Sequence, residues 1–288
     1  MKKFRYLFVV LMCVASLVSC KKHELIYDVE VQGDMAQFQF HYFEPVAENA
    51  TNYIDSVKVN DVLYSSYTVQ NSIGQLIPYN AIPGGGMGRF FNVAAGNVNF
   101  KMYRKGVLVY DQNATLKVGR QNLFVYNMNQ PPIVLDNEYP YWPDRTTTST
   151  AFGTDSICSL RFINFMFENA TTPYPGKLKY QFNRQGEVDA SGNQIWNDVG
   201  DYIGFGETTP REILVLHKSI YNSSGYQRFN YRVLKEDGTP LYVTNTKGKS
   251  VVYSDYWNAY IGRVYNHIFC GIRTVKSPAV SVRVWYSL

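Results

Sequence analysis

The chain has few charged residues, few histidines and no long hydrophobic run. Charged residues make up 18% of its 288 residues, and only four histidines occur. The longest apolar stretch, Tyr6 to Val18, has about 13 residues, whereas a transmembrane helix needs about 20. The sequence therefore does not predict a membrane-spanning helix.

Catalytic motifs are also missing from the sequence. No Gly-x-Ser-x-Gly elbow occurs, and Gly84–Gly86 lacks the Gly-Lys-Ser/Thr ending that phosphate binding requires. None of the four histidines has the spacing of paired metal ligands. His41 lies on a predicted strand opposite Phe40 and Tyr42, which favours a surface or partly hydrogen-bonded histidine over a metal ligand. We predict no enzyme, no cofactor and no metal site.

The first twenty residues have the pattern of a secretory signal. Lys2, Lys3 and Arg5 precede the apolar stretch, as in a signal peptide. The segment ends in Leu17-Val18-Ser19-Cys20, which resembles the bacterial lipobox. The resemblance implies that residues 1–19 are removed as a signal peptide and that Cys20 receives lipid on its sulfur and its new amino group. The alternative is an ordinary secretory signal that ends in a chance cysteine.

The lipobox resemblance also bears on the compartment. Residue 21 is lysine rather than aspartate, so the common signal for retention in the inner membrane is missing. We expect an outer-membrane protein attached through lipid on Cys20, and the sequence leaves open whether it faces the periplasm or the cell surface. Three acyl chains would hold it far more firmly than one.

Net charge argues against a nucleic-acid partner. Three of the 28 basic residues and none of the 23 acidic residues fall within residues 1–19. Residues 20–288 therefore carry a net charge of only about +2, which is far from the basic surface that a phosphate backbone requires.

Two cysteines remain in the body of the chain, Cys158 and Cys270. An oxidising compartment permits a disulfide between them. Two buried free thiols are the alternative, because a free cysteine behaves as a small apolar residue. The sequence leaves both open.

Aromatic residues are abundant and predict an all-β fold. The chain has 24 tyrosines and 17 phenylalanines, residue types that favour strands. Residues 36–43 alternate between apolar and polar side chains, as in a strand with one buried face. Asn60-Asp61 and Lys105-Gly106 each separate two apolar stretches and predict hairpin turns.

Residues 34–128 resemble a known family of domains. Phe90 to Gly96 precedes a strand pattern, and Leu116 to Gly119 precedes Leu123-Phe-Val-Tyr126. This arrangement is similar to immunoglobulin-like domains of bacterial envelope proteins, often found as tandem pairs in Bacteroidetes lipoproteins without an assigned function. The resemblance implies an immunoglobulin-like β-sandwich.

The second half repeats part of this pattern. Glu-Asn-Ala-Thr occurs at residues 48–51 and again at 168–171, each time after an alternating stretch. We therefore predict an internal repeat and two tandem immunoglobulin-like β-sandwiches. The predicted segments are a signal peptide at 1–19, a lipid-anchored tether with a first strand at 20–33, domain one at 34–131, a Pro- and Thr-rich linker at 132–154, and domain two at 155–288.

Aromatic residues in predicted loops are the candidate ligand-binding residues. Trp196, Tyr256 and Trp257 lie beside asparagine and aspartate residues, and Trp142 lies in the predicted linker. Aromatic rings stack on the apolar C–H faces of sugars while polar neighbours bind hydroxyl groups. The alternative is that these rings cover the ends of the sandwich cores.

These features favour a non-enzymatic binding module of the cell envelope, with a polysaccharide or an envelope protein as its partner. The alternative is a structural or adhesion subunit, such as an anchor of a fimbria-like assembly. A glycan binder should expose aromatic rings near polar side chains, whereas a structural subunit should present an open sheet edge.

Overall fold

The computed structural model describes residues 35–46, 50–65, 90–137, 156–216, 226–260 and 262–287. They all belong to one compact unit, Gly33–Leu288. The predicted signal peptide, the tether and Cys20 lie outside these ranges. Within them, no helix has the length and apolar character that a membrane crossing requires.

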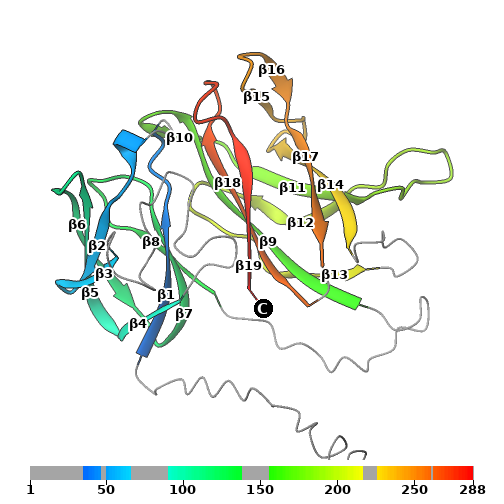
Figure 1. The fold of residues 1–288 in the computed structure, drawn as a ribbon. Coiled ribbons are helices and arrows are strands. Elements are labelled where there is room, and N and C mark those ends of the chain that lie inside the picture. Colours follow the sequence, from blue (N-terminus) through cyan, green and yellow to red (C-terminus); the bar gives the residue numbers. More distant parts are fainter. Residues whose placement is uncertain are drawn as a thin grey trace, which may run out of the picture. The chain divides into compact units, whose positions relative to one another are not determined.

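The first half forms a β-sandwich (Figure 1). One sheet has the strand order β4-β1-β7-β8 and the other has the order β3-β2-β5-β6. Strand β1 runs parallel to β7, and every other pair is antiparallel. A short 3-10 helix, η1 (Ala50–Asn52), precedes β2. The strands are β1 (Met35–Tyr42), β2 (Ser56–Val59), β3 (Val62–Ser65), β4 (Phe91–Ala94), β5 (Gly96–Arg104), β6 (Val107–Leu116), β7 (Gly119–Val125) and β8 (Ile133–Asp136).

The second half forms another β-sandwich (Figure 1). In one sheet, β9 pairs with β18 on one side and with both β10 and β13 on the other, and β19 follows β18. The facing sheet has the order β12-β11-β14-β17, and β15 and β16 form a separate ribbon. The strands are β9 (Ser156–Asn169), β10 (Thr172–Pro173), β11 (Leu178–Arg184), β12 (Asn197–Ile203), β13 (Glu212–Leu216), β14 (Gln227–Lys235), β15 (Tyr242–Thr244), β16 (Ser250–Val252), β17 (Ser254–Ala259), β18 (Val264–Ile272) and β19 (Ser281–Ser287).

The two sandwiches share one topology. Strands β1 to β8 correspond in chain order to β9, β11, β12, β13, β14, β17, β18 and β19. Every pairing is repeated, including the parallel one, which joins β1 to β7 in the first sandwich and β9 to β18 in the second. The predicted internal repeat is therefore confirmed at the level of the fold. Strand β10, the ribbon β15–β16 and a long β11–β12 hairpin are additions of the second copy.

The two predicted hairpin turns agree with the structure. Asn60, Asp61 and Lys105 have positive φ angles of 48°, 63° and 52°, and Gly106 follows at 72°. Positive φ at both central residues is the signature of a type I′ turn, which matches the twist of a hairpin.

The predicted linker 132–154 begins with residues of β8, which pairs with β7, so the first sheet extends past residue 131. Residues 138–155 lie outside the described ranges.

Aromatic side chains fill each sandwich. Phe38 of β1 meets Phe100 of β5 edge-on, with ring centroids 5.4 Å apart. In the second sandwich, the centroids of Phe162 on β9 and Tyr180 on β11 are 5.2 Å apart. These contacts join the two facing sheets. They form because every second side chain of a strand points to the inner face of its sheet.

Of the two alternatives for Cys158 and Cys270, the structure shows two buried free thiols and no disulfide between them. The two residues lie on neighbouring strands, but Cys270 of β18 stands opposite Phe165 of β9. Cys158 lies seven residues from Phe165, roughly 23 Å along the strand at 3.3 Å per residue. A disulfide requires Cα atoms closer than about 7 Å. The free-thiol alternative is the correct one.

The second face of the β1–β7 sheet is also covered. His41, expected at the surface, is fully buried. Phe165 of β9 stacks on Phe124 of β7, with centroids 4.6 Å apart, and lies 5.9 Å from Phe43. Ile163 and Phe165 belong to the same apolar cluster as the first sandwich core. The two sandwiches are therefore joined by a continuous apolar contact.

Phe165→Ala tests this contact. Removing a fully buried phenylalanine leaves a cavity, and we expect a loss of roughly 3–5 kcal/mol in the free energy of unfolding. Urea denaturation measures it. Leu108→Ala, at a position 45% exposed, is the control and should change stability by less than about 0.5 kcal/mol. Equal effects of the two substitutions would contradict the shared core.

Two buried histidines predict acid sensitivity. Burial lowers the pKa of His41 and of His267 to about 3, so both are neutral in the folded protein at pH 5. In the unfolded chain each has a pKa near 6.5 and takes up a proton as the pH falls below that value. Because the unfolded state then binds more protons, stability should decrease by roughly 1–2 kcal/mol per histidine between pH 7 and pH 5.

Denaturation curves at pH 7, 6 and 5 measure this loss. His267→Gln should be less stable at pH 7, because the ring Nδ1 lies 2.9 Å from the Tyr180 hydroxyl. Its stability should nevertheless depend less on pH than that of the unaltered protein. An unchanged slope in the variant would show that His267 does not cause the acid sensitivity.

Candidate functional site

The outward face of the sheet β12-β11-β14-β17 is the candidate site. On β14, Phe229, Tyr231 and Val233 are buried in the second core, so the alternate residues Arg228 and Arg232 point outward. Neighbouring strands add aromatic and polar side chains to the same face. We call this surface the arginine face; its residues are Lys179, Gln181, Trp196, Asp198, Arg228, Asn230, Arg232 and Tyr256.

Trp196 reaches the arginine face because of the β11–β12 hairpin. The amide nitrogen of Asn183 donates to the backbone carbonyls of Glu187 and Ile195, at 2.8 and 2.7 Å. These bonds tie the two arms of the hairpin together immediately before Trp196. The ring of Trp196 is half-buried, and the guanidinium carbon of Arg232 lies 4.2 Å from its centroid. This is a close cation–π contact.

Tyr256 forms the matching contact on β17. The guanidinium carbon of Arg228 lies 3.5 Å from the centroid of the Tyr256 ring, and Tyr256 is 50% exposed. The arginine face therefore holds two stacked ring–guanidinium pairs. Both guanidinium groups come from β14.

Strand register places the two rings in one row. Asn230 stands opposite Tyr256 on one side and opposite Asn183 on the other. Phe182 pairs with Asn197, so Trp196 follows at the position facing Asn183. The row crosses four strands, and its two ends are roughly 14 Å apart at about 4.8 Å per strand. Two aromatic residues therefore flank a central pair of asparagines.

A hydrogen-bonded network occupies the neighbouring row. Arg232 Nε donates to Gln181 Oε1 at 2.8 Å, and Gln181 Nε2 donates to Asp198 Oδ1 at 2.6 Å. Lys179 Nζ lies 2.9 Å from Asp198 Oδ2 and 3.6 Å from Asp201 Oδ1. Burial alone would raise the pKa of Asp198, but the hydrogen bonds from Gln181 and Lys179 outweigh it and lower the pKa. The carboxylate is ionised and already bound.

The corresponding face of the first sandwich is chemically different. It carries Lys58 and Lys101 instead of arginines, and Lys101 pairs with Asp61 at 2.7 Å. Its outward ring, Tyr103, has the Lys58 ammonium 5.4 Å from its centroid. The two copies of the fold thus differ on this surface, and the ring–guanidinium pairs belong to the second copy.

The structure brings together two of the four predicted binding aromatics. Trp196 and Tyr256 share the arginine face, although Tyr256 lies in a strand rather than the predicted loop. Trp257 is a wrong prediction, because it points inward from β17 and is only 4% exposed, with its ring 5.1 Å from that of Phe229. Trp142 lies outside the described residues. The sequence analysis missed Arg228 and Arg232, although the alternation of β14 indicates their outward direction.

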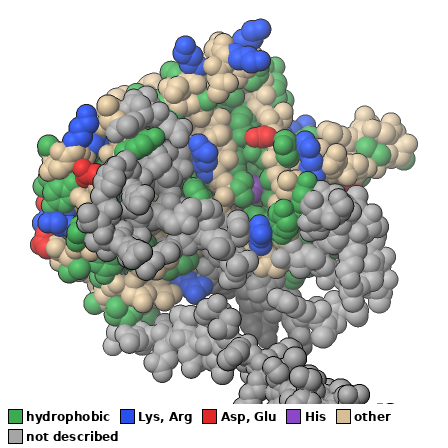
Figure 2. Space-filling view, in the orientation of Figure 1, with side chains coloured by type: hydrophobic (Ala, Val, Ile, Leu, Met, Phe, Trp, Pro, Cys, Tyr) green, Lys and Arg blue, Asp and Glu red, His purple; other side chains and the backbone are tan. Residues whose placement is uncertain are grey.

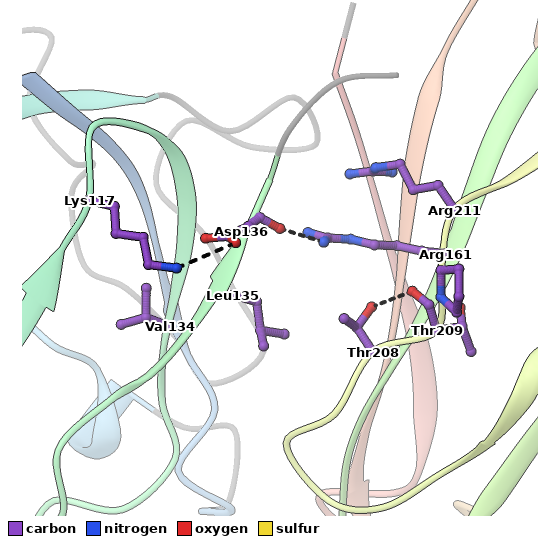
Figure 3. Close-up of a pocket in the computed structure, with 9 residues that line it drawn as sticks. Lys117, Val134, Leu135, Asp136, Arg161, Thr208, Thr209 and Arg211 are labelled. Atoms are coloured by element: carbon purple, nitrogen blue, oxygen red, sulfur yellow. Dashed lines mark hydrogen bonds and ion pairs between the residues drawn. The ribbon is translucent and has the colours of Figure 1, made fainter. Parts of the chain in front are cut away.

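A separate pocket of about 440 Å³ lies beside β8 and β9 (Figure 3). Arg161 donates from Nη1 to the Asp136 carbonyl at 2.6 Å and from Nε to Asn266 Oδ1 at 2.7 Å. Arg211 Nη2 donates to Asn137 Oδ1 at 2.7 Å. These bonds tie the end of the first sandwich to β9 and β18. The lining residues are Lys117, Val134, Leu135, Asp136, Arg161, Thr208, Thr209, Pro210 and Arg211.

Surface charge is dispersed on the side of the molecule drawn in Figure 2, where lysine and arginine side chains lie scattered among polar and apolar atoms. In the part of the chain that the structure describes, no group of three or more His, Cys, Asp or Glu side chains is arranged to hold a metal ion. The features that characterise the arginine face are its aromatic rings, the guanidinium groups in contact with them and its hydrogen-bond donors.

Comparisons with known proteins identify no family. No family model and no curated protein matches the chain. Among solved structures, a leucine-rich repeat protein from Bacteroides thetaiotaomicron has 9% identity and a TM-score of 0.20 over 85% of this chain and 27% of that chain. The TIE protein of Bacillus anthracis has 10% identity and a TM-score of 0.22, over 82% and 33%.

A third solved structure, the minor pilin of Streptococcus agalactiae, has 9% identity and a TM-score of 0.22 over 85% of this chain and 99% of that chain. The chain thus spans about a quarter to a third of the first two proteins. Similarity at these TM-scores carries no argument about function.

Proposed function

We propose that this chain is a non-enzymatic binding module of the bacterial cell envelope, a lipoprotein of the Bacteroidetes type that binds a glycan on its arginine face. The observation that carries the proposal is the row across one sheet face in which Trp196 and Tyr256 lie at the two ends with Asn230 between them. Asn183, also in this row, is buried and holds the β11–β12 hairpin that carries Trp196. The proposal extends to the anchor, which is lipid on Cys20 in the outer membrane.

The chemistry of the face suits a sugar chain. An aromatic ring provides an apolar surface for the C–H face of a pyranose, and the nearby amide and guanidinium groups donate hydrogen bonds to oxygen atoms. Fixed side chains lower the entropy cost of binding. Stacking fixes Arg228 and Arg232, and the bond to Gln181 further restrains Arg232.

The alternative role, a structural or adhesion subunit, has its own supporting feature. Strand β6 (Val107–Leu116) pairs with β5 and has no second partner strand among the described residues. Val107 and Leu108 on it are 63% and 45% exposed. An unpaired edge strand is a template for addition of a strand from another chain. Failure of the glycan test below would favour this role.

Trp196→Ala and Tyr256→Ala test glycan binding. The detergent-solubilised lipidated protein is run through native gels that contain single polysaccharides, neutral and acidic. Each substitution should weaken binding about five- to tenfold, because a lost stacking contact is worth about 1–1.5 kcal/mol.

Tyr103→Ala is the matched control, since Tyr103 occupies the equivalent face of the first sandwich next to a lysine. It should bind like the unaltered protein. Retardation that survives both ring substitutions, or that Tyr103→Ala abolishes equally, would place binding elsewhere. Absence of retardation on the whole panel would reject the glycan function.

The lipid anchor is tested with Cys20→Ser. We expect the unaltered protein to incorporate labelled palmitate and to sediment with outer membranes. The variant should lose the label and leave the membrane fraction, because serine cannot form the thioether. Cys158→Ser is the control and should keep the label, since that thiol is buried. Label retained in Cys20→Ser would refute lipidation at this residue.

A further inference from the structure

We propose that the arginine face binds a linear acidic polysaccharide, with Arg228 and Arg232 each holding one carboxylate on a different sugar. This inference rests on the proposed function and specifies its ligand class. It concerns the charge of the ligand.

Contact with the rings leaves N–H donors of both arginines available. The guanidinium carbon of Arg228 lies 3.5 Å from the centroid of Tyr256, and that of Arg232 lies 4.2 Å from the centroid of Trp196. Nε of Arg232 already donates to Gln181, so its terminal nitrogens are the donors left for a ligand. The two terminal nitrogens of a guanidinium group match the two oxygens of a carboxylate.

Neither arginine has a carboxylate partner within the described residues. Their ion pairs would appear at nitrogen–oxygen distances of 4 Å or less, and none involves Arg228 or Arg232. Asp198, which lies across Gln181 from Arg232, is hydrogen-bonded to Lys179 and Gln181, and the charge of Arg232 also helps to lower its pKa. No described carboxylate of this face lies within ion-pair distance of either arginine, so a carboxylate of a ligand can take that position.

The two guanidinium groups are far enough apart to meet different sugars of one chain. That of Arg228 lies over Tyr256 and that of Arg232 lies over Trp196, the two ends of the row across the sheet, which are roughly 14 Å apart. Asn230 lies between them and is placed to meet a sugar of the intervening segment.

The test uses three probes that separate charge from sugar. Hyaluronan carries one carboxylate per disaccharide, carboxyl-reduced hyaluronan has the same sugar backbone without charge, and polyglutamate is a polyanion without sugar rings. Binding of the detergent-solubilised lipidated protein to each probe is measured by calorimetry at 50 and 300 mM NaCl. The variants are Arg228→Gln and Arg232→Gln, and Lys101→Gln on the first sandwich is the matched control. Thermal melts check that all variants are folded.

We expect hyaluronan to bind at least tenfold more tightly than its carboxyl-reduced form. Each arginine substitution should lower hyaluronan affinity about tenfold and reduce its salt dependence, since screening acts on the lost charge contact. Lys101→Gln should change neither. Affinity for the reduced polymer should depend on Trp196 and Tyr256 but little on the arginines.

Other outcomes overturn the inference. Equal binding of both hyaluronan forms would reject the acidic ligand and leave the glycan function standing. Binding of polyglutamate as tight as that of hyaluronan would show a non-specific polyanion surface. Absence of binding to hyaluronan and to every acidic polysaccharide of the panel, with binding to a neutral one, rejects this ligand class alone, whereas absence on all polysaccharides rejects the glycan function as well.

Discussion

Strand β9 packs apolar side chains on both of its faces, and the rest of the molecule depends on this. Phe162 and Leu160 enter the core of the second sandwich, while Ile163 and Phe165 enter the cluster that contains the core of the first. The second sandwich can bury only one face of β9, so the other face needs the first sandwich. The packing of Ile163 and Phe165 therefore stabilises the first sandwich as well as the second, and the parallel pairing of β9 with β18 fixes the position of both sets of contacts.

Because the chain contains two copies of one fold, the two sandwiches can be compared with each other. The eight strands of the first sandwich have counterparts in the second with the same order, direction and pairing. The second sandwich adds β10, the ribbon β15–β16 and the long β11–β12 hairpin, and it differs in the outward face of one sheet. Shared features are what the fold requires, so the arginines, the two rings and the hairpin that carries Trp196 are among the features that the fold does not require. This contrast supports the choice of the arginine face as the binding surface.

The sequence predicted the positions of strands well, but it predicted poorly to which face of a strand each side chain points. The strand over residues 36–43 and the turns at Asn60-Asp61 and Lys105-Gly106 were predicted close to their observed positions, because alternation and turn residues are local signals. Tyr256 and Trp257 are adjacent, and in a strand adjacent side chains point to opposite faces. A reading of that segment as a loop removes this distinction, so one buried and one exposed ring were treated alike. The burial of His41 was also missed, because alternation shows that a strand has two faces and not which of them another sheet covers.

The parallel pairing of β1 with β7 has a mechanical consequence. Their register extends over seven residue pairs, from Ala36–Gly119 to Tyr42–Val125. Phe38, Gln121 and Asp136 stand in one row across β1, β7 and β8, so the chain enters this sheet and leaves it at the same end. Under the proposed anchor on Cys20, a pull on the second sandwich would separate these strands from that end, one hydrogen bond after another. The apolar contact of Phe165 with Phe43 and Phe124 would then have to carry the load.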